Sequence, residues 1–108
     1  MIIEVWSCVI APNKWEEAND WGKRIAEAHK KQTSVVSARA FHSETGNPDE
    51  FMKIHIELDF LTMAERQSYY QKGGGFWADE IQALNKENTD NQYIDPCGLG
   101  HHYYSVLD

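Results

Sequence analysis

The stretch Phe51-Met52-Lys53-Ile54-His55-Ile56-Glu57-Leu58-Asp59-Phe60 (residues 51–60) decides the fold. Apolar residues occupy every even position from Met52 to Phe60, and charged or polar residues occupy the odd positions between them. This alternation is typical of a strand with one buried face, because successive side chains of a strand point to opposite sides. We therefore predict a strand here, with the even positions under a layer of helices and Lys53, His55, Glu57 and Asp59 on the other face.

The segments around this strand alternate between strand-like and helical patterns. Residues 2–10 and 34–43 read as two further strands, and residues 102–107 read as a short last strand. Residues 13–31 and 62–84 carry apolar residues at helical spacing. The resulting β-α-β-β-α-β order is the split βαβ layout. It predicts an α+β, ferredoxin-like fold, in which a four-stranded antiparallel sheet carries both helices on one face.

Local sequence signals place the ends of these elements. Two pairs of residues have the spacing of a capping box, namely Asn13 with Glu16 and Thr62 with Glu65. We therefore expect the two helices to begin at Asn13 and Thr62. Residues 44–49 have turn chemistry at nearly every position and predict a hairpin loop between the second and third strands.

Three consecutive glycines interrupt the second helix. Each glycine at 73–75 costs about 1 kcal/mol relative to alanine inside a helix, so the helix should break there. The helical period resumes over 76–84, with Trp77, Ile81 and Leu84 on one stripe. Residues 85–100 are polar and lack apolar periodicity, which predicts an irregular connector.

Composition limits the classes of function. The chain has 108 residues and 42% hydrophobic residues, so we expect one globular domain over 1–108. Its net charge of −7, without a basic stripe, argues against nucleic acid and anionic membranes as partners. Two cysteines, Cys8 and Cys97, do not make a disulfide framework. The sequence has no apolar stretch long enough to span a bilayer and no pattern of a secretory leader peptide at its start. We therefore expect a cytoplasmic location.

Strand parity brings aromatic groups to the sheet face without helices. In the first strand we place Ile3, Val5 and Val9 toward the helices. The opposite, helix-free face then receives Glu4, Trp6 and Cys8 of the first strand, Val35, Ser37, Arg39 and Phe41 of the second, and Tyr103 or Tyr104 of the last. This face can be washed by solvent, as in many antiparallel sheets. Its apolar area instead favours a contact that removes it from water. We therefore predict a homodimer in which this sheet face packs against the same face of a second chain.

The same face supplies the candidate site. His55 and Glu57 share a face, and Arg39 lies on the paired strand. We predict that these three are catalytic, with His55 moving a proton, Glu57 orienting it and Arg39 binding a ligand oxygen. Trp6, Phe41 and Tyr103 would bind the substrate. The alternative is a structural ion-pair network without turnover, because buried charges need partners in any case.

A metal site is not expected. Cys97 with His101 and His102 lacks a recognised ligand spacing. Adjacent residues of a strand point to opposite faces, so only one of the two histidines could face a shared ion.

The chain resembles the dimeric α+β barrel superfamily in its element order and in the helix restart Gly75-Phe76-Trp77-Ala78-Asp79-Glu80-Ile81-Gln82-Ala83-Leu84. That segment is similar to one that follows the broken second helix in NIPSNAP-like proteins. The superfamily includes antibiotic-biosynthesis-type monooxygenases and isomerases, and two of its chains pair their sheets face to face.

The resemblance implies a small-molecule ligand and a cofactor-independent monooxygenase or isomerase that acts on an aromatic or polyketide-like substrate. The alternative that it implies is a non-catalytic ligand-binding or assembly protein of NIPSNAP-like type. Haem-degrading members carry an Asn on the first strand, which this chain lacks, so no cofactor is expected.

Overall fold

The computed structural model describes residues 1–44 and 52–107, with the backbone alone over 96–99. In chain order the elements are β1 (Ile2–Ile10), α1 (Trp15–Lys30), β2 (Ser37–His42), β3 (Lys53–Phe60), α2 (Met63–Tyr70), the 3₁₀ helix η1 (Gly75–Trp77), α3 (Asp79–Asn91) and β4 (Ile94–Ser105). The hairpin loop predicted over 44–49 lies, apart from Glu44, outside the described residues.

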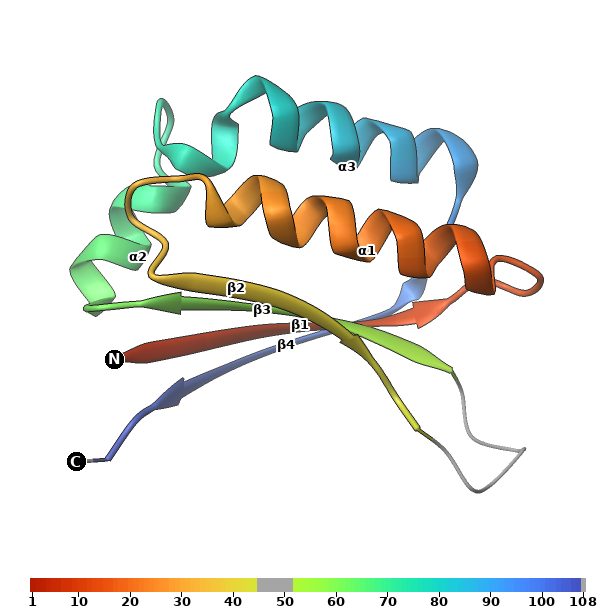
Figure 1. The fold of residues 1–108 in the computed structure, drawn as a ribbon, viewed down its shortest axis with the longest axis horizontal. Helices are drawn as coiled ribbons and strands as arrows, with labels where there is room; N and C mark the ends of the chain where they lie inside the picture. The colour runs from red at the N-terminus through yellow and green to blue at the C-terminus, as the bar shows by residue number, and fades with distance from the viewer. Residues whose placement is uncertain (45–51, 108) are drawn as a thin grey trace.

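Within the described residues the strands form one antiparallel four-stranded sheet in the order β2-β3-β1-β4. The helices all cover one face of it, and the two chain ends lie at the same end of the molecule (Figure 1). A register shift between Cys8 and Ile10 divides the pairing of β1 with β4 into two segments. The predicted ferredoxin-like α+β fold is confirmed.

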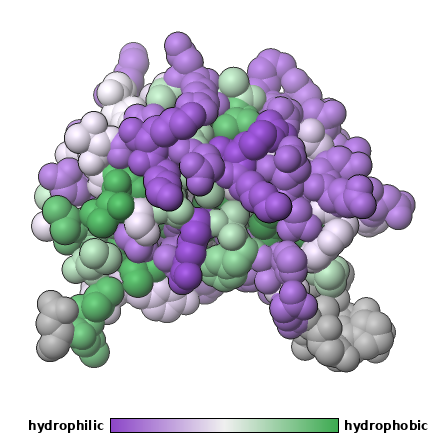
Figure 2. Space-filling model, in the orientation of Figure 1, coloured by the Kyte–Doolittle hydropathy of each residue, from purple (hydrophilic) through white to green (hydrophobic). Residues whose placement is uncertain are grey.

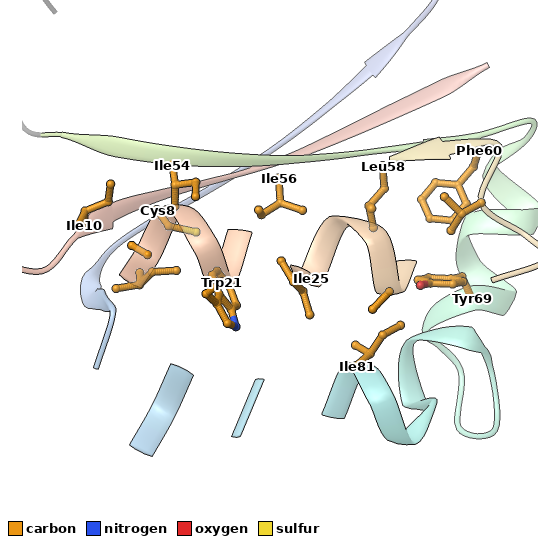
Figure 3. Close-up of a cluster of buried hydrophobic side chains, with 14 residues drawn as sticks. Cys8, Ile10, Trp21, Ile25, Ile54, Ile56, Leu58, Phe60, Tyr69 and Ile81 are labelled. Carbon is orange, nitrogen blue, oxygen red and sulfur yellow. The ribbon is translucent and has the colours of Figure 1, made fainter. Parts of the chain in front are cut away.

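The core lies between β3 and the helices. Ile54, Ile56, Leu58 and Phe60 keep at most 4% of their surface exposed. Figure 3 shows them in a row that faces Trp21 and Ile25 of α1, with Tyr69 of α2 beside Phe60. The alternation of β3 therefore places its apolar side chains as predicted.

The predicted parity of β1 is wrong. Glu4, Cys8 and Ile10 are buried on the helix side, and Trp6 packs against the same core. Cross-strand pairing agrees, because Glu4 lies opposite Leu58 and Trp6 lies opposite Ile56. The even and the odd positions of β1 are both largely apolar, so the prediction depended on Glu4 alone. A charged residue usually faces solvent, and the even positions were therefore placed on the exposed side. The negative charge of the Glu4 carboxylate is instead balanced inside the protein, by side chains that are distant in the sequence.

The start of β2 also differs from the prediction. Val35 is buried in the core and Val36 is 49% exposed, which reverses their expected sides. The two valines precede β2, which begins only at Ser37, so strand alternation does not yet apply to them. From Ser37 onward the parity is as predicted, with Arg39 opposite Glu57 and both on the helix-free face.

One of the two capping predictions is confirmed. The Thr62 hydroxyl accepts a hydrogen bond from the Glu65 amide at 3.1 Å and opens α2. The prediction for Asn13 is wrong, because α1 begins after Lys14 without a side-chain cap. Asn13 has a positive φ of 64°, a conformation that asparagine tolerates better than most residues.

The second helix breaks at the glycines, as predicted, into α2, η1 and α3. The connector predicted over 85–100 is wrong: α3 continues to Asn91, and β4 begins at Ile94 rather than at residue 102. Trp77, which was predicted to share one stripe with Ile81, is 49% exposed, whereas Ile81 is buried.

The outer surface of the helices is mostly hydrophilic in Figure 2. This agrees with amphipathic helices that bury one face, as α1 does with Trp21, Gly22 and Ile25. None of the helices in the described part of the chain is long and apolar enough to cross a membrane.

The glycine break yields a stability prediction. A Cβ at Gly74 would lie 2.3 Å from the Ser68 carbonyl oxygen and 2.6 Å from that of Tyr69. Since backbone must then move, we expect Gly74→Ala to lower the free energy of unfolding by about 3 kcal/mol. Gly73 has a φ of 84° but open space around it, so Gly73→Ala should lose only about 1 kcal/mol. Urea unfolding of both variants tests this, and equal losses would contradict it.

A candidate site between the sheet and the helices

A pocket of ≈ 570 Å³ lies between the sheet and the helices. Its volume is in the range of small-molecule sites. Most of its wall is apolar or aromatic and comes from several elements. These residues are Trp6 and Cys8 of β1, Trp21 and Ile25 of α1, Ile56 of β3, Tyr70 of α2, Phe76 of η1 and Ile94 of β4.

One wall of the pocket is polar. It is formed by Asn85, Asn88, Thr89 and Gln92, which are spaced so that they share one face of α3 and its C-terminal cap. An apolar space with one polar wall suits an aromatic molecule that carries a few polar groups. This polar stripe has helical spacing, but it carries no apolar periodicity, which is the pattern from which the helices were predicted.

His29 of α1 contributes the imidazole ring in the pocket wall. It is 5% exposed, and its Nδ1 shares a 2.6 Å hydrogen bond with the Tyr69 hydroxyl. Burial lowers the pKa of His29 to about 4. The imidazole is therefore neutral at pH 7 and can accept a proton there.

Glu4 is a charged side chain with no exposed surface. Its carboxylate accepts hydrogen bonds from Arg66 Nε at 2.7 Å and from the Tyr70 hydroxyl, and it pairs with His101 Nε2 at 2.8 Å. These partners come from α2 and β4. Because Tyr70 also lines the pocket, the Glu4 network forms the support behind one pocket wall.

The same network reaches the surface through Tyr103. The Tyr103 hydroxyl accepts from Arg66 at 2.5 Å and lies 3.4 Å from His101 Nδ1. Trp6 stacks on the His101 imidazole, with ring centroids 3.6 Å apart and planes 9° from parallel. Trp6 and Tyr103 therefore lie on the helix side of the sheet, and their predicted place on the helix-free face is wrong.

The other four predicted site residues do meet on the helix-free face. Arg39 donates two hydrogen bonds to the Glu57 carboxylate, at 3.1 and 3.2 Å. Phe41 stacks on His55, with centroids 5.0 Å apart, and Arg39 lies 5.5 Å above the Phe41 ring. The structure thus divides the predicted set into two groups on opposite sides of the sheet.

His55 has partners other than the predicted Glu57. Its Nδ1 bonds the Ser7 hydroxyl at 2.8 Å and its Nε2 bonds the Ser43 hydroxyl at 3.2 Å. Burial, and to a lesser extent the charge of Lys53, lower the pKa of His55. An orienting role of Glu57 toward His55 therefore has no support in these contacts, and the catalytic roles of Arg39, His55 and Glu57 stay predictions.

No group of three or more histidine, cysteine or acidic side chains in the described residues could hold a metal ion. His101 bonds Glu4 on the helix side, while His102 pairs with Val5 on the opposite face, as their adjacency predicts. The side chain of Cys97 lies outside the described residues. Burial raises the pKa of Cys8 to about 11, so this thiol is not a reactive thiolate.

No protein-family model and no curated protein sequence matches the chain. Solved structures do match. The cofactor-independent oxygenase SnoaB from Streptomyces nogalater is similar with a TM-score of 0.67 and 7% identity, over 99% of this chain and 93% of that one. The chain has the fold of antibiotic biosynthesis monooxygenases.

Two further solved structures share this fold. An antibiotic biosynthesis monooxygenase is similar with a TM-score of 0.69 and 8% identity, over the full length of both chains. A dimeric ferredoxin-like protein from Bacteroides fragilis is similar with a TM-score of 0.70 and 13% identity, over 97% of this chain and 95% of that one. The predicted likeness to the dimeric α+β barrel superfamily is confirmed at the level of the fold.

Besides the polar stripe of α3, two buried pairs at or behind the pocket wall were not predicted from the sequence. Glu4 and Arg66 are 62 positions apart, and His29 and Tyr69 are 40 apart. No local pattern marks either pair. The one available signal was the position of His29 on the apolar face of α1, where a buried histidine needs a partner.

The Glu4 network yields a second prediction. Replacing Arg66 by Met leaves a fully buried carboxylate without its cation, so we expect the free energy of unfolding to fall by about 3 kcal/mol. Arg39→Met is the matched control, because Arg39 pairs with Glu57 in the same way but has a 70% exposed side chain. Chemical denaturation should show a much smaller loss for that control. A similar loss in both variants would contradict the structural importance of the Glu4 pair.

Proposed function

We propose that the chain binds a planar aromatic molecule in the helix-side pocket and acts on it as a cofactor-independent monooxygenase. The observation that carries the proposal is a neutral, buried histidine in the wall of an aromatic pocket of ligand size. The likeness in fold to the oxygenase SnoaB supports the class of reaction. The substrate class is an aromatic ketone or phenol with an acidic C–H or O–H group.

In this proposal His29 is the general base. Its Nδ1 keeps the proton and donates it to the Tyr69 oxygen, which leaves Nε2 free to accept a proton from the substrate. Burial disfavours the imidazolium, but the substrate anion formed beside it offsets that effect. Trp6, Trp21 and Phe76 hold the flat ring system of the substrate between them.

The proposed reaction uses dioxygen as the oxidant. His29 removes one proton from an activated CH₂ group, and the resulting carbanion gives its electrons to dioxygen and forms a C–O bond. The O–O bond then breaks. One oxygen atom stays on the product as a carbonyl oxygen, and the other leaves as water with the two hydrogens of the CH₂ group.

An isomerase would share the first step and return the proton to another carbon of the substrate. A non-catalytic ligand-binding protein would use the same pocket without proton transfer. Turnover that consumes dioxygen separates the monooxygenase from both alternatives.

The test uses anthrone, whose CH₂ group is activated by two aromatic rings and a ketone. We expect the protein to bind it, seen as quenching of tryptophan fluorescence, and to speed its aerobic conversion to anthraquinone. His29→Gln should bind anthrone but convert it about 100-fold more slowly. Because the base form of His29 exists above its pKa, the wild-type rate should be constant near pH 7 and fall toward pH 4.

Two variants of α3 locate the binding site for anthrone. Thr89→Trp fills the pocket and should abolish binding, whereas Ala83→Trp lies outside the pocket on the same helix and should not. Binding without accelerated oxidation would favour the ligand-binding alternative. If Thr89→Trp binds anthrone as tightly as the wild type does, this pocket is not the binding site for anthrone.

We also propose that the helix-free face pairs with a second copy of the chain. Phe41 is 42% exposed and Tyr104 53% exposed, and the strand pairing places both on this face. Exposed aromatic groups on a sheet face favour association. The dimeric neighbour from Bacteroides fragilis supports this arrangement.

Light scattering coupled to gel filtration tests the pairing. The wild type should have twice the mass of one chain, and Phe41→Glu should convert it to a monomer because a charge then lies in the apolar contact. Ala64→Glu, at an exposed position of α2, is the control and should stay dimeric. If the Phe41→Glu monomer loses anthrone binding, the face with Arg39, His55 and Glu57 becomes the better candidate site.

A further inference from the structure

Gln92, at the C-terminal cap of α3, has a left-handed backbone conformation, with a φ of 53° and a ψ of 52°. A side chain makes this conformation unfavourable, because its Cβ comes too close to the following carbonyl oxygen. Helices that end in this way usually have glycine at this position. The Gln92 amide donates to the Asn88 carbonyl at 2.7 Å and closes the helix, and a glycine amide would do the same. The glutamine side chain therefore brings no advantage to the cap itself.

The Gln92 side chain belongs to the polar wall of the helix-side pocket. On this wall Asn85 and Asn88 are half-buried, and the Thr89 hydroxyl donates to the Asn85 carbonyl at 3.1 Å. Gln92 is exposed, and within the described part of the chain its carboxamide has no hydrogen-bond partner. The two N–H donors and the carbonyl oxygen of this carboxamide are therefore open to a molecule in the pocket.

We infer that the Gln92 carboxamide hydrogen-bonds a hydroxyl group of the ligand, which makes Gln92 a specificity-determining residue. This inference rests on the proposed function, because it concerns the ligand of the same pocket. It narrows the substrate class to aromatic molecules that carry a hydroxyl group. A hydroxyl both donates and accepts, as the carboxamide does, and a neutral group suits a chain with a net charge of −7 better than an anion. The backbone strain at the cap is then retained for binding.

The competing partner for this carboxamide lies within the chain. Asn88 Oδ1 is buried without a hydrogen-bond partner among the described residues, and Asn88 lies one helical turn before Gln92. If the Gln92 side chain turned toward this oxygen, its role would be structural. The two roles differ in their effect on the protein without ligand. Loss of the carboxamide destabilises the protein if the role is structural, and it does not if the partner is a ligand.

Two variants separate the carboxamide from the backbone strain, with the melting temperature without ligand measured by circular dichroism. Gln92→Gly removes both, so its melting temperature should rise by about 3 °C. Gln92→Met keeps the strain and a similar length but has no amide, so its melting temperature should stay within about 1 °C of the wild type. Asn13→Gly is the control, because Asn13 also has a positive φ, of 64°, but does not line the pocket.

Equilibrium dialysis then compares 1-naphthol with 1-methylnaphthalene, in which a methyl group replaces the hydroxyl. The measured quantity is the ratio of the two association constants, 1-naphthol over 1-methylnaphthalene. We expect this ratio to be about 10-fold smaller in both Gln92 variants than in the wild type, and unchanged in Asn13→Gly. A change of the pocket that affects both compounds equally cancels in the ratio.

The outcomes distinguish this inference from the proposed function. An unchanged ratio in the Gln92 variants overturns the inference while the pocket stands. A lower melting temperature in both variants also overturns it, because the carboxamide then has a partner within the chain. A wild type that binds anthrone but neither naphthalene has the same consequence. If the wild type binds none of the three compounds, the proposed function fails together with the inference.

Discussion

A carboxylate without exposed surface is stable in a protein interior only where cations and hydrogen-bond donors surround it. Glu4 meets this condition through Arg66 and Tyr70 of α2 and His101 of β4. These groups join the first strand, the broken second helix and the last strand of the chain at one point. The position of α2 against the sheet follows from this charge, and so does the position of the Tyr70 ring in the pocket wall.

The opposite side of the pocket is held by contacts between helices. Trp21 bonds the Leu84 carbonyl, and Arg24 donates two hydrogen bonds to the Glu87 carboxylate, at 3.0 and 2.5 Å. Both contacts join α1 to α3, the two helices that lie over the same face of the sheet in Figure 1. On one side of the pocket α2 is held to the sheet, and on the other side α1 is held to α3. A binding site needs such fixed walls in order to select its ligand by shape.

The fold could be predicted from the sequence, whereas most of the site could not. The alternation of β3 and the glycine break are local signals, and both gave correct elements. The side of Trp6 depended on the partners of Glu4, which lie 62 to 97 positions away and leave no local trace. The extent of α3 was missed for a different reason, because the helix presents a polar rather than an apolar stripe to the pocket. Arg39, Phe41, His55 and Glu57 were grouped correctly because hairpin pairing is a nearest-neighbour property.

The two ends of α3 perform separate tasks. Ile81, in its first turn, is fully buried and anchors the helix in the core, whereas Asn88 and Thr89, two turns later, face the pocket. Substitutions at the pocket-facing positions remove no core packing, so selection can alter them at little risk to folding. Related chains with this architecture can therefore diverge in ligand preference along one half of a helix while the other half stays constrained.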